Sequence, residues 1–575
     1  MSRYFHTQDN RVNYGEALSP APGYELDFAV GMTYSLDLEA FLSIPVFLSC
    51  SDNTEDVNNS PYSVLDAIKR AGDKIVLFCN GDGIKYVNPK NAPFFAMIED
   101  CIYPVSMPEK HYFHPKLWVV RYKKTNAPDK LRVIVLSRNL TFDRSLDIAA
   151  TLDADVTGEN HAENQGLADI VRFAAKKMPS SNKRNQALGL ADSIERADLF
   201  DCGRDFDAYC FVPFGIPGHK DESDTFFTRA FDLIIVSPFL SDGIVSKMAD
   251  ATLYNKRIIT RITAASQKVF DSFGEVWVPK DGILTDEILE ETTAEETKRD
   301  LHAKIIYRTT PAGNFLHLGS LNATSNAFYR NVEFMLELKY KPYHGGFGTL
   351  RSDLLPDEDC VFRKIYSPSP EAEGEREEEF CDFSDVVRAI KSAKVEEADD
   401  GFCLTISSRK LDSEVWIAPM LKSEVFVRFG EEVVFDKLQD REISCFYIVK
   451  RDNEKRIVKI PTDGIPVERD DVLFNSILQD KAGFFAYLLF LLSGGRSEAF
   501  FQQEDFRHLL GRKDNDRVLQ TLAPSLYERL LRAAAEGGDK IQSVADVAER
   551  VAPDMIDDTL KDLIKLIKDS IRKRR

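Results

Sequence analysis

Short apolar runs and runs of helical period alternate along residues 25–345 of the chain. Residues 74–79 and 232–240 are rich in apolar side chains and predict buried strands, while residues 64–71 and 242–250 have the spacing of short helices. Strands that alternate with helices favour a layered α/β structure.

One stretch of this pattern occurs twice, at residues 113–152 and more clearly at residues 301–338. Each copy has a His-x-Lys pair, an apolar run, a turn, and a second apolar run that ends in Ser-x-Asn. The pairs are His114 with Lys116 and His302 with Lys304, and the strand ends are Ser137 with Asn139 and Ser320 with Asn322. Each copy predicts strand, turn, strand, with His and Lys on one face of the first strand, because residues two apart in a strand share a face. We interpret the chain as a divergent duplication.

The pattern changes after an acidic, proline-bearing stretch. The predicted divisions are a first half at residues 1–185, a second half at residues 186–366, an acidic linker at residues 367–382, a β-rich accessory domain at residues 383–470 and a helical C-terminal domain at residues 471–575. The fold class is therefore α/β, with two α/β/α sandwich halves that share one active site, followed by a small β-rich domain and a helical region.

Composition describes an ordinary soluble protein, with 43% hydrophobic and 29% charged residues. The nine cysteines include no C-x-x-C spacing, which favours reduced, buried thiols over disulfides or a zinc site. The N-terminus lacks the apolar core of a signal peptide, and no apolar run is long enough to span a membrane, so we expect a cytoplasmic protein without membrane contact. The net charge of −19 argues mildly against a nucleic-acid partner, although a basic cleft can coexist with an acidic exterior.

The duplicated residue types suit a phosphodiester. Two sets facing each other would place two imidazoles, two ammonium groups and two amides around one phosphorus, where cations and amides stabilise the developing charge. One neutral imidazole can attack phosphorus while the other, protonated, donates to the leaving oxygen. Asp147 and Glu333, one after each copy, are the candidates to orient the imidazoles, and Ser137 and Ser320 are candidate substrate contacts. This chemistry requires no metal and no cofactor. The alternative is that both histidines are ordinary strand residues, but these are the only His-x-Lys pairs among the nine histidines.

These motifs resemble the phospholipase D superfamily over roughly residues 25–345. The family often has an Asp five positions after the Lys, where this chain has Arg121 and Thr309, as in the tyrosyl-DNA phosphodiesterase branch and some bacterial nucleases. The resemblance implies two phospholipase D-like halves and a metal-independent phosphohistidine mechanism. By family analogy His114 is the nucleophile and His302 the acid.

Three functions follow as hypotheses. The first is a nuclease that cleaves DNA or RNA, with a role in bacterial restriction or anti-phage defence beside a helicase or ATPase partner subunit. The second is a phospholipase or phosphatidyl transferase, and the third is a catalytically silent phosphate-binding scaffold that needs a partner. The segment beyond residue 380 could contact nucleic acid or a partner, or form a homodimer.

Overall fold

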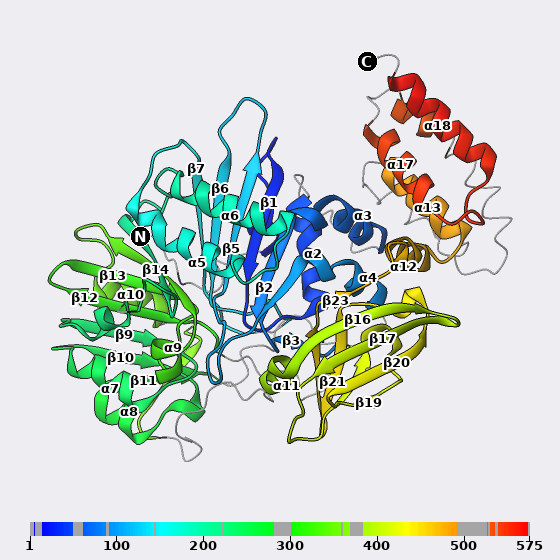
Figure 1. Ribbon diagram of the computed structural model, residues 1–575. Helices are drawn as coiled ribbons and strands as arrows, with labels where there is room; N and C mark the ends of the chain where they lie inside the picture. The colour runs from blue at the N-terminus through cyan, green and yellow to red at the C-terminus, as the bar shows by residue number, and fades with distance from the viewer. Residues whose placement is uncertain are drawn as a thin grey trace. The chain divides into compact units, whose positions relative to one another are not determined.

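The computed structural model describes residues 5, 14–49, 61–87, 91–142, 145–220, 222–280, 301–357, 360–368, 383–492, 526, 529–534 and 539–572. They form two compact units (Figure 1). Unit 1 comprises Met1–Phe41, Asp73–Lys85 and Cys101–Arg388, and unit 2 comprises Leu42–Gly72, Tyr86–Asp100 and Ala389–Arg575. Two segments that we placed in the first half, residues 42–72 and 86–100, therefore group with the C-terminal residues. Residues 369–382 of the predicted linker lie outside the described chain.

The first sheet of unit 1 follows the strand order β4-β2-β1-β5-β6-β7. Its strands are β1 (Glu25–Met32), β2 (Ile75–Asn80), β4 (Ile102–Val105), β5 (Leu117–Lys123), β6 (Lys130–Leu136) and β7 (Ala149–Asp155), and the short β3 (Ile84–Lys85) lies between β2 and β4 in sequence. β4, β2 and β1 are parallel, and β5, β6 and β7 continue the sheet antiparallel.

The six central strands of the second sheet repeat this arrangement, and β15 and β8 are added at its two edges. Its order is β15-β11-β10-β9-β12-β13-β14-β8, in which β11-β10-β9 are parallel and β12, β13 and β14 follow antiparallel. The strands are β8 (Phe206–Phe214), β9 (Asp232–Val236), β10 (Lys256–Ile259), β11 (Glu275–Pro279), β12 (Ile305–Thr310), β13 (Gly313–Gly319), β14 (Glu333–Tyr340) and β15 (Phe362–Ile365). The duplicated α/β halves predicted from the sequence are confirmed by this topology.

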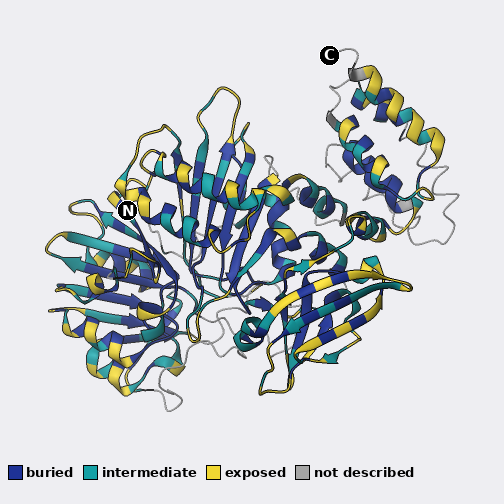
Figure 2. Ribbon diagram, in the orientation of Figure 1, coloured by how far each residue is buried: buried dark blue, intermediate teal, exposed yellow. Residues whose placement is uncertain are grey.

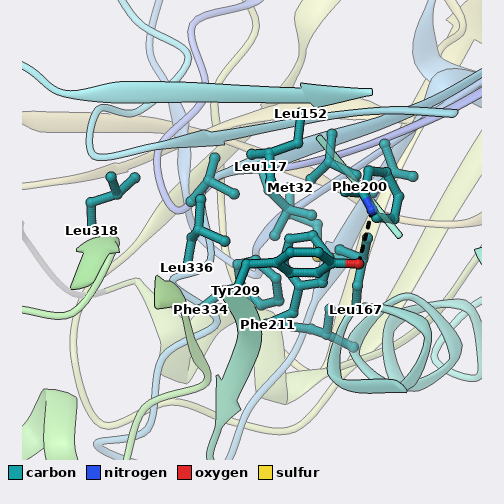
Figure 3. Close-up of a cluster of buried hydrophobic side chains, with 14 of the residues drawn as sticks. Met32, Leu117, Leu152, Leu167, Phe200, Tyr209, Phe211, Leu318, Phe334 and Leu336 are labelled. Carbon is teal, nitrogen blue, oxygen red and sulfur yellow. Dashed lines mark hydrogen bonds between the residues drawn. The ribbon is translucent and has the colours of Figure 1, made fainter. Parts of the chain in front are cut away.

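A core of buried apolar side chains joins the two sheets. Leu117 of β5 and Leu336 of β14 belong to one cluster (Figure 3). Tyr209 of β8 also lies in this cluster, and its hydroxyl accepts the backbone N–H of Phe200 at 3.0 Å and donates to Asn164 Oδ1 at 2.6 Å, so its polar atom is satisfied. Because the two halves share this cluster, separating them would expose apolar surface from both.

Successive side chains along a strand point to opposite faces of the sheet, so each sheet also has a face that lies away from the shared core. On β5, Leu117 and Val119 point into the shared core, while Trp118 lies on the opposite face against Gly31. A Cβ at Gly31 would come within 2.6 Å of the Trp118 ring, so the indole needs a glycine there.

Helices cover the sheets of unit 1. They are α1 (Tyr14–Leu18), α5 (Gln165–Ala175), α6 (Asn182–Glu195), α7 (Asp242–Asp250), α8 (Gln267–Ser272), α9 (Ser325–Tyr329) and α10 (Phe347–Leu354), and α11 (Ser384–Ala389) ends one residue beyond the division between the units. Apolar residues of α5 and α6 join the shared core, whereas those of α7, α8 and α9 pack with the other face of the second sheet.

Unit 2 contains a β-rich part and a helical part, as the sequence predicted. One set of strands has the order β20-β17-β16-β23, and another runs β19-β18-β21-β22. Their bounds are β16 (Ile390–Ala398), β17 (Gly401–Ser408), β18 (Trp416–Pro419), β19 (Val427–Arg428), β20 (Glu432–Leu438), β21 (Phe446–Arg451), β22 (Glu454–Lys459) and β23 (Thr462–Asp463). β16 and β20 alternate between buried and exposed positions, which is typical of an antiparallel sheet with one solvated face (Figure 2).

The helices of unit 2 are α3 (Pro61–Ala71), α4 (Ala92–Met97), α12 (Arg469–Leu478), α13 (Lys481–Leu492), α17 (Asp539–Arg550) and α18 (Asp558–Arg572), and α2 (Leu38–Ser49) crosses the division between the units. A buried ion pair between Glu99 and Arg469 anchors the segment that carries α4. Glu99 also accepts the backbone N–H of Cys445 at 2.8 Å. Across the described residues, every helix is too short or too polar to cross a bilayer.

Candidate active site

Both His-x-Lys pairs lie just before a strand rather than on it. β5 begins at Leu117 and β12 at Ile305, so the prediction that the pairs occupy the first strand is wrong by a few residues. The reason is that the backbone at each histidine bonds to the opposite half. His114 N–H donates to the carbonyl of Val332 and His302 N–H to the carbonyl of Leu146, each at 2.9 Å.

These crossing bonds bring the residue types of both halves together. Val332 immediately precedes Glu333, and Leu146 immediately precedes Asp147. The backbone of each histidine is therefore held next to the segment that carries the acidic residue of the other copy. The site is completed only when both halves are present.

His114 is held in one tautomer. Its Nδ1 lies 2.8 Å from Glu333 Oε2, and its Nε2 lies 2.9 Å from Lys116 Nζ. An ammonium group only donates hydrogen bonds, so Nε2 accepts and the ring proton is on Nδ1, where it donates to Glu333. Burial, with the nearby charges of Lys116 and Lys304, lowers the pKa of His114 well below its ordinary value. The ring is neutral, with its lone pair on Nε2.

Glu333 is fully buried and is surrounded by donors. Ser320 Oγ donates to Oε2, and Asn331 Nδ2 donates to Oε1 at 3.3 Å. Burial raises the pKa of Glu333 to about 8, although the charge of Lys116 and the Ser320 hydrogen bond act in the opposite direction. The ionised carboxylate that accepts from His114 is therefore fully populated only above that pH.

The second pair is built differently. Lys304 Nζ donates to the carbonyl of His302 at 2.8 Å and to the carbonyl of Ser137 at 3.4 Å, so this ammonium group spans the two halves. Burial, followed by the charges of Lys304 and Arg261, lowers the pKa of His302 to about 2. A bound phosphodiester would supply the negative charge that allows this imidazole to hold a proton.

The predicted serine and asparagine residues lie around the pairs. Ser137 Oγ accepts the N–H of Ile148 at 2.9 Å, as Ser320 Oγ accepts the N–H of Phe334 at 3.0 Å. Both serines are fully buried, and these contacts hold the strand ends, so direct contact with a substrate stays a prediction.

The two asparagines differ in what holds their amide oxygens. Asn139 Oδ1 accepts the backbone N–H of Ser35 at 3.2 Å, so the amino group of the Asn139 side chain points away from the backbone of Ser35. Asn322 Oδ1 is buried and accepts no hydrogen bond from any described residue. The catalytic roles of both asparagines stay predictions.

Asp147 has contacts unlike those of Glu333. Its carboxylate lies 3.4 Å from Arg138 Nη1 and accepts from Ser145 Oγ at 3.3 Å. The difference follows from the middle residue of Ser-x-Asn, which is Arg138 in the first half and Leu321 in the second. The structure thus brings Glu333 to an imidazole and Asp147 to a guanidinium group.

Sequence reasoning missed several residues of the site. The Tyr34 ring centroid lies 4.9 Å from that of His114 and 5.8 Å from Lys116 Nζ. Asn331 and Arg261 were also missed. Arg138 could have been found because it lies inside the Ser-x-Asn motif, whereas Tyr34 and Arg261 carry no local motif. Within the described ranges, no three His, Cys, Asp or Glu side chains gather as ligands for a metal ion, and the metal-free mechanism stays a prediction.

No protein-family model and no curated protein sequence matches this chain. Among solved structures, polyphosphate kinase from Porphyromonas gingivalis is similar with 11% identity and a TM-score of 0.35, over 66% of this chain and 51% of that chain. A yeast tyrosyl-DNA phosphodiesterase variant has 9% identity and a TM-score of 0.37, over 59% and 87%. Phosphatidylserine synthase from Haemophilus influenzae has 11% identity and a TM-score of 0.36, over 62% and 86%. The chain spans about half the length of the polyphosphate kinase. These low TM-scores assign neither a family nor an activity.

Proposed function

We propose that the chain is a metal-independent phosphodiesterase whose one active site is shared by its two halves. The observation that carries the proposal is the crossed contact of His114 with Glu333, which comes from the other copy and fixes the tautomer of a neutral imidazole. A neutral imidazole whose lone pair is on Nε2 is the form that attacks phosphorus.

The reaction proceeds in two displacements. In the first, His114 Nε2 leaves Lys116 and bonds to phosphorus, while the bond from phosphorus to the leaving oxygen breaks and protonated His302 gives that oxygen its proton. In the second, neutral His302 takes a proton from water as the water oxygen bonds to phosphorus, and the bond from phosphorus to His114 breaks. Lys116 and Lys304 hold the non-bridging oxygens throughout, because their charges stabilise the added negative charge.

Nucleic acid is the substrate class that the charges of the site favour. Lys116, Lys304, Arg138 and Arg261 all act on His302, and a polyanion benefits most from such a cationic pocket. With the resemblance of the duplicated motifs, this supports a nuclease. A helicase or ATPase partner and a role in bacterial defence are proposed from that resemblance alone. A phospholipase or phosphatidyl transferase would use the same two displacements and is a second outcome of the test.

The test uses the full chain in EDTA with labelled single-stranded DNA, double-stranded DNA, RNA and phosphatidylcholine. Wild-type protein is expected to cleave nucleic acid, and His114→Asn is expected to lose cleavage. His161→Gln is the matched control, because this histidine contacts Asp198 at 3.5 Å and has no place in the site.

A second measurement follows the covalent step. With His302→Asn the leaving oxygen lacks its proton donor and the water lacks its base, so labelled phosphate is expected to stay bound to His114 and to be lost in acid. Cleavage of lipid alone would refute the choice of substrate. A strict need for Mg²⁺ would refute the mechanism.

A further inference from the structure

One row of side chains crosses four neighbouring strands of unit 2. In the set β19-β18-β21-β22, Trp416 of β18 lies opposite Arg428 of β19 and Lys450 of β21. Lys450 in turn lies opposite Lys455 of β22. Residues directly opposite each other in adjacent strands point to the same face of a sheet. Three cations and one indole therefore lie side by side on one face, over about 14 Å at the usual spacing between strands.

Two further aromatic rings contact the ammonium group of Lys455. Its Nζ lies 4.9 Å from the ring centroid of Tyr86 and 5.8 Å from that of Phe426. Phe426 comes two residues before Arg428, which belongs to the strand at the other end of the row. The row therefore combines cations with aromatic rings, and cation–π contacts hold some of them together.

The rings of this face are open to solvent. Trp416 is 38% exposed and Tyr86 is 37% exposed, whereas Trp118 in the first sheet is 1% exposed. Ile417, the next residue of β18, points to the opposite face and is fully buried. The core contacts of this strand therefore come from its neighbours, and the indole of Trp416 keeps a surface that a ligand can cover.

The lysines of the row keep their positive charge. Arg428 Nε lies 3.8 Å from Glu414 Oε1, and because these side chains are 68% and 60% exposed, water screens the pair. Among the residues that the structure describes, neither Lys450 nor Lys455 forms an ion pair with a carboxylate. The face is therefore locally basic in a chain whose net charge is −19.

We propose that this face of unit 2 binds single-stranded nucleic acid, with bases stacked on its exposed rings and phosphates held by its lysines. The rings are Trp416 and Tyr86, and the lysines are Lys450 and Lys455. Every base has a flat face that stacks on an aromatic ring, and cations beside the rings follow the phosphate backbone. A duplex keeps its bases stacked inside, and a lipid surface has no base to stack, so rings and cations together favour a single strand. This contact is separate from the active site, because none of its residues belongs to that site.

Binding of a fluorescein-labelled oligothymidylate to the full chain tests the face. The measurement uses a His114→Ala background, so that cleavage does not consume the probe. Trp416→Ala is expected to raise Kd about tenfold because one stacked base is lost, and Trp416→Phe is expected to restore most of the affinity because the ring is kept. Lys394→Gln is the control, because this lysine lies on β16, outside the row, and pairs with Glu396.

The salt dependence of binding reports on the lysines. Replacing Lys450 or Lys455 by Gln is expected to lower the slope of log Kd against log salt by about 0.7 for each lysine, whereas Lys394→Gln should keep the wild-type slope. With His114 intact, each of these variants is expected to hydrolyse bis(4-nitrophenyl) phosphate at the wild-type rate, because none of the replaced residues belongs to the active site.

An unchanged Kd in Trp416→Ala, or an equal loss of affinity in Lys394→Gln, would overturn the proposal. Equal affinity for a blunt-ended duplex would overturn the choice of a single strand. Binding to phosphatidylserine vesicles without binding to the oligonucleotide would overturn it in favour of a lipid surface. Absence of turnover on every substrate would overturn the proposed function, while the binding measurements would still decide on this face.

Discussion

Replacing Glu333 by Gln tests how the site holds its nucleophile. Gln has nearly the same volume and can still accept the His114 Nδ1 proton, but it neither ionises nor carries charge. With bis(4-nitrophenyl) phosphate, whose leaving group needs no proton from His302, we expect the wild-type rate of the first displacement to rise as pH passes about 8, because burial raises the pKa of Glu333 to about 8 and the ionised carboxylate selects the reactive tautomer of His114. In Glu333→Gln that rise should be absent, and the rate should fall about 10- to 100-fold.

The same carboxyl makes stability depend on pH. Its pKa is about 8 in the folded protein against an ordinary 4.5, so the folded state binds the proton more tightly and stability is lost as pH rises towards 8. At 1.36 kcal/mol per pKa unit, the wild type should lose about 4 kcal/mol relative to Glu333→Gln between about pH 5 and about pH 9. Groups outside the site titrate alike in both proteins, so the difference reports on Glu333 together with the His114 imidazole that it contacts.

Unfolding in urea measures this difference. Of the three tryptophans, Trp118 and Trp277 lie in unit 1 and Trp416 in unit 2. In a Trp416→Phe background, fluorescence therefore reports on the unit that contains the site. Parallel stability profiles for the wild type and Glu333→Gln would refute the reasoning, because they would mean that the carboxyl has the same pKa folded and unfolded.

Three further predictions concern other parts of the chain. His302→Gln should make the protein about 2 kcal/mol more stable than the wild type near pH 5. Burial lowers the pKa of His302 to about 2, so at that pH only the unfolded wild-type chain binds the proton. Equal loss of stability in acid for both proteins would contradict this. Gly319→Ala should lower stability by about 1–3 kcal/mol in a thermal melt, because its φ is +152° and a Cβ would lie 2.3 Å from the Phe334 carbonyl, whereas Gly243→Ala should not. Arg469→Met should destabilise unit 2 by about 3–5 kcal/mol by leaving Glu99 buried without its cation, and adding Glu99→Gln should restore part of the loss.

The duplication could be predicted because its signal is local. Each copy keeps His-x-Lys and Ser-x-Asn at the ends of apolar runs, and strands with such runs pair in the same order in both sheets. Glu333 was predicted as an acid that orients an imidazole, but which histidine it contacts was not, because His114 and Glu333 are 219 positions apart and meet only through the crossed backbone bonds. Asp147 occupies the corresponding place but contacts Arg138. A pattern of residue types does not show whether such a carboxylate will bind the imidazole of His302 or the guanidinium group of Arg138.

The division of the chain into its two units could also not be predicted from local sequence patterns. Glu99 follows a short helix in the first part of the sequence, yet its carboxylate binds Arg469 and the N–H of Cys445. A helix pattern indicates that a face will be buried but not against which distant segment. The same holds for Arg261, which becomes part of the site only because β10 ends at the edge where β12 begins.

The unequal halves have a consequence for how such a protein can change over generations. Two identical chains in a symmetric dimer would carry every substitution twice, so an arginine gained beside one histidine would appear beside the other. Once the two copies are joined in one gene, each position is free to differ, as Arg138 and Leu321 do here. Fusion thus allows the surroundings of the two imidazoles to diverge, as the different contacts of Glu333 and Asp147 show.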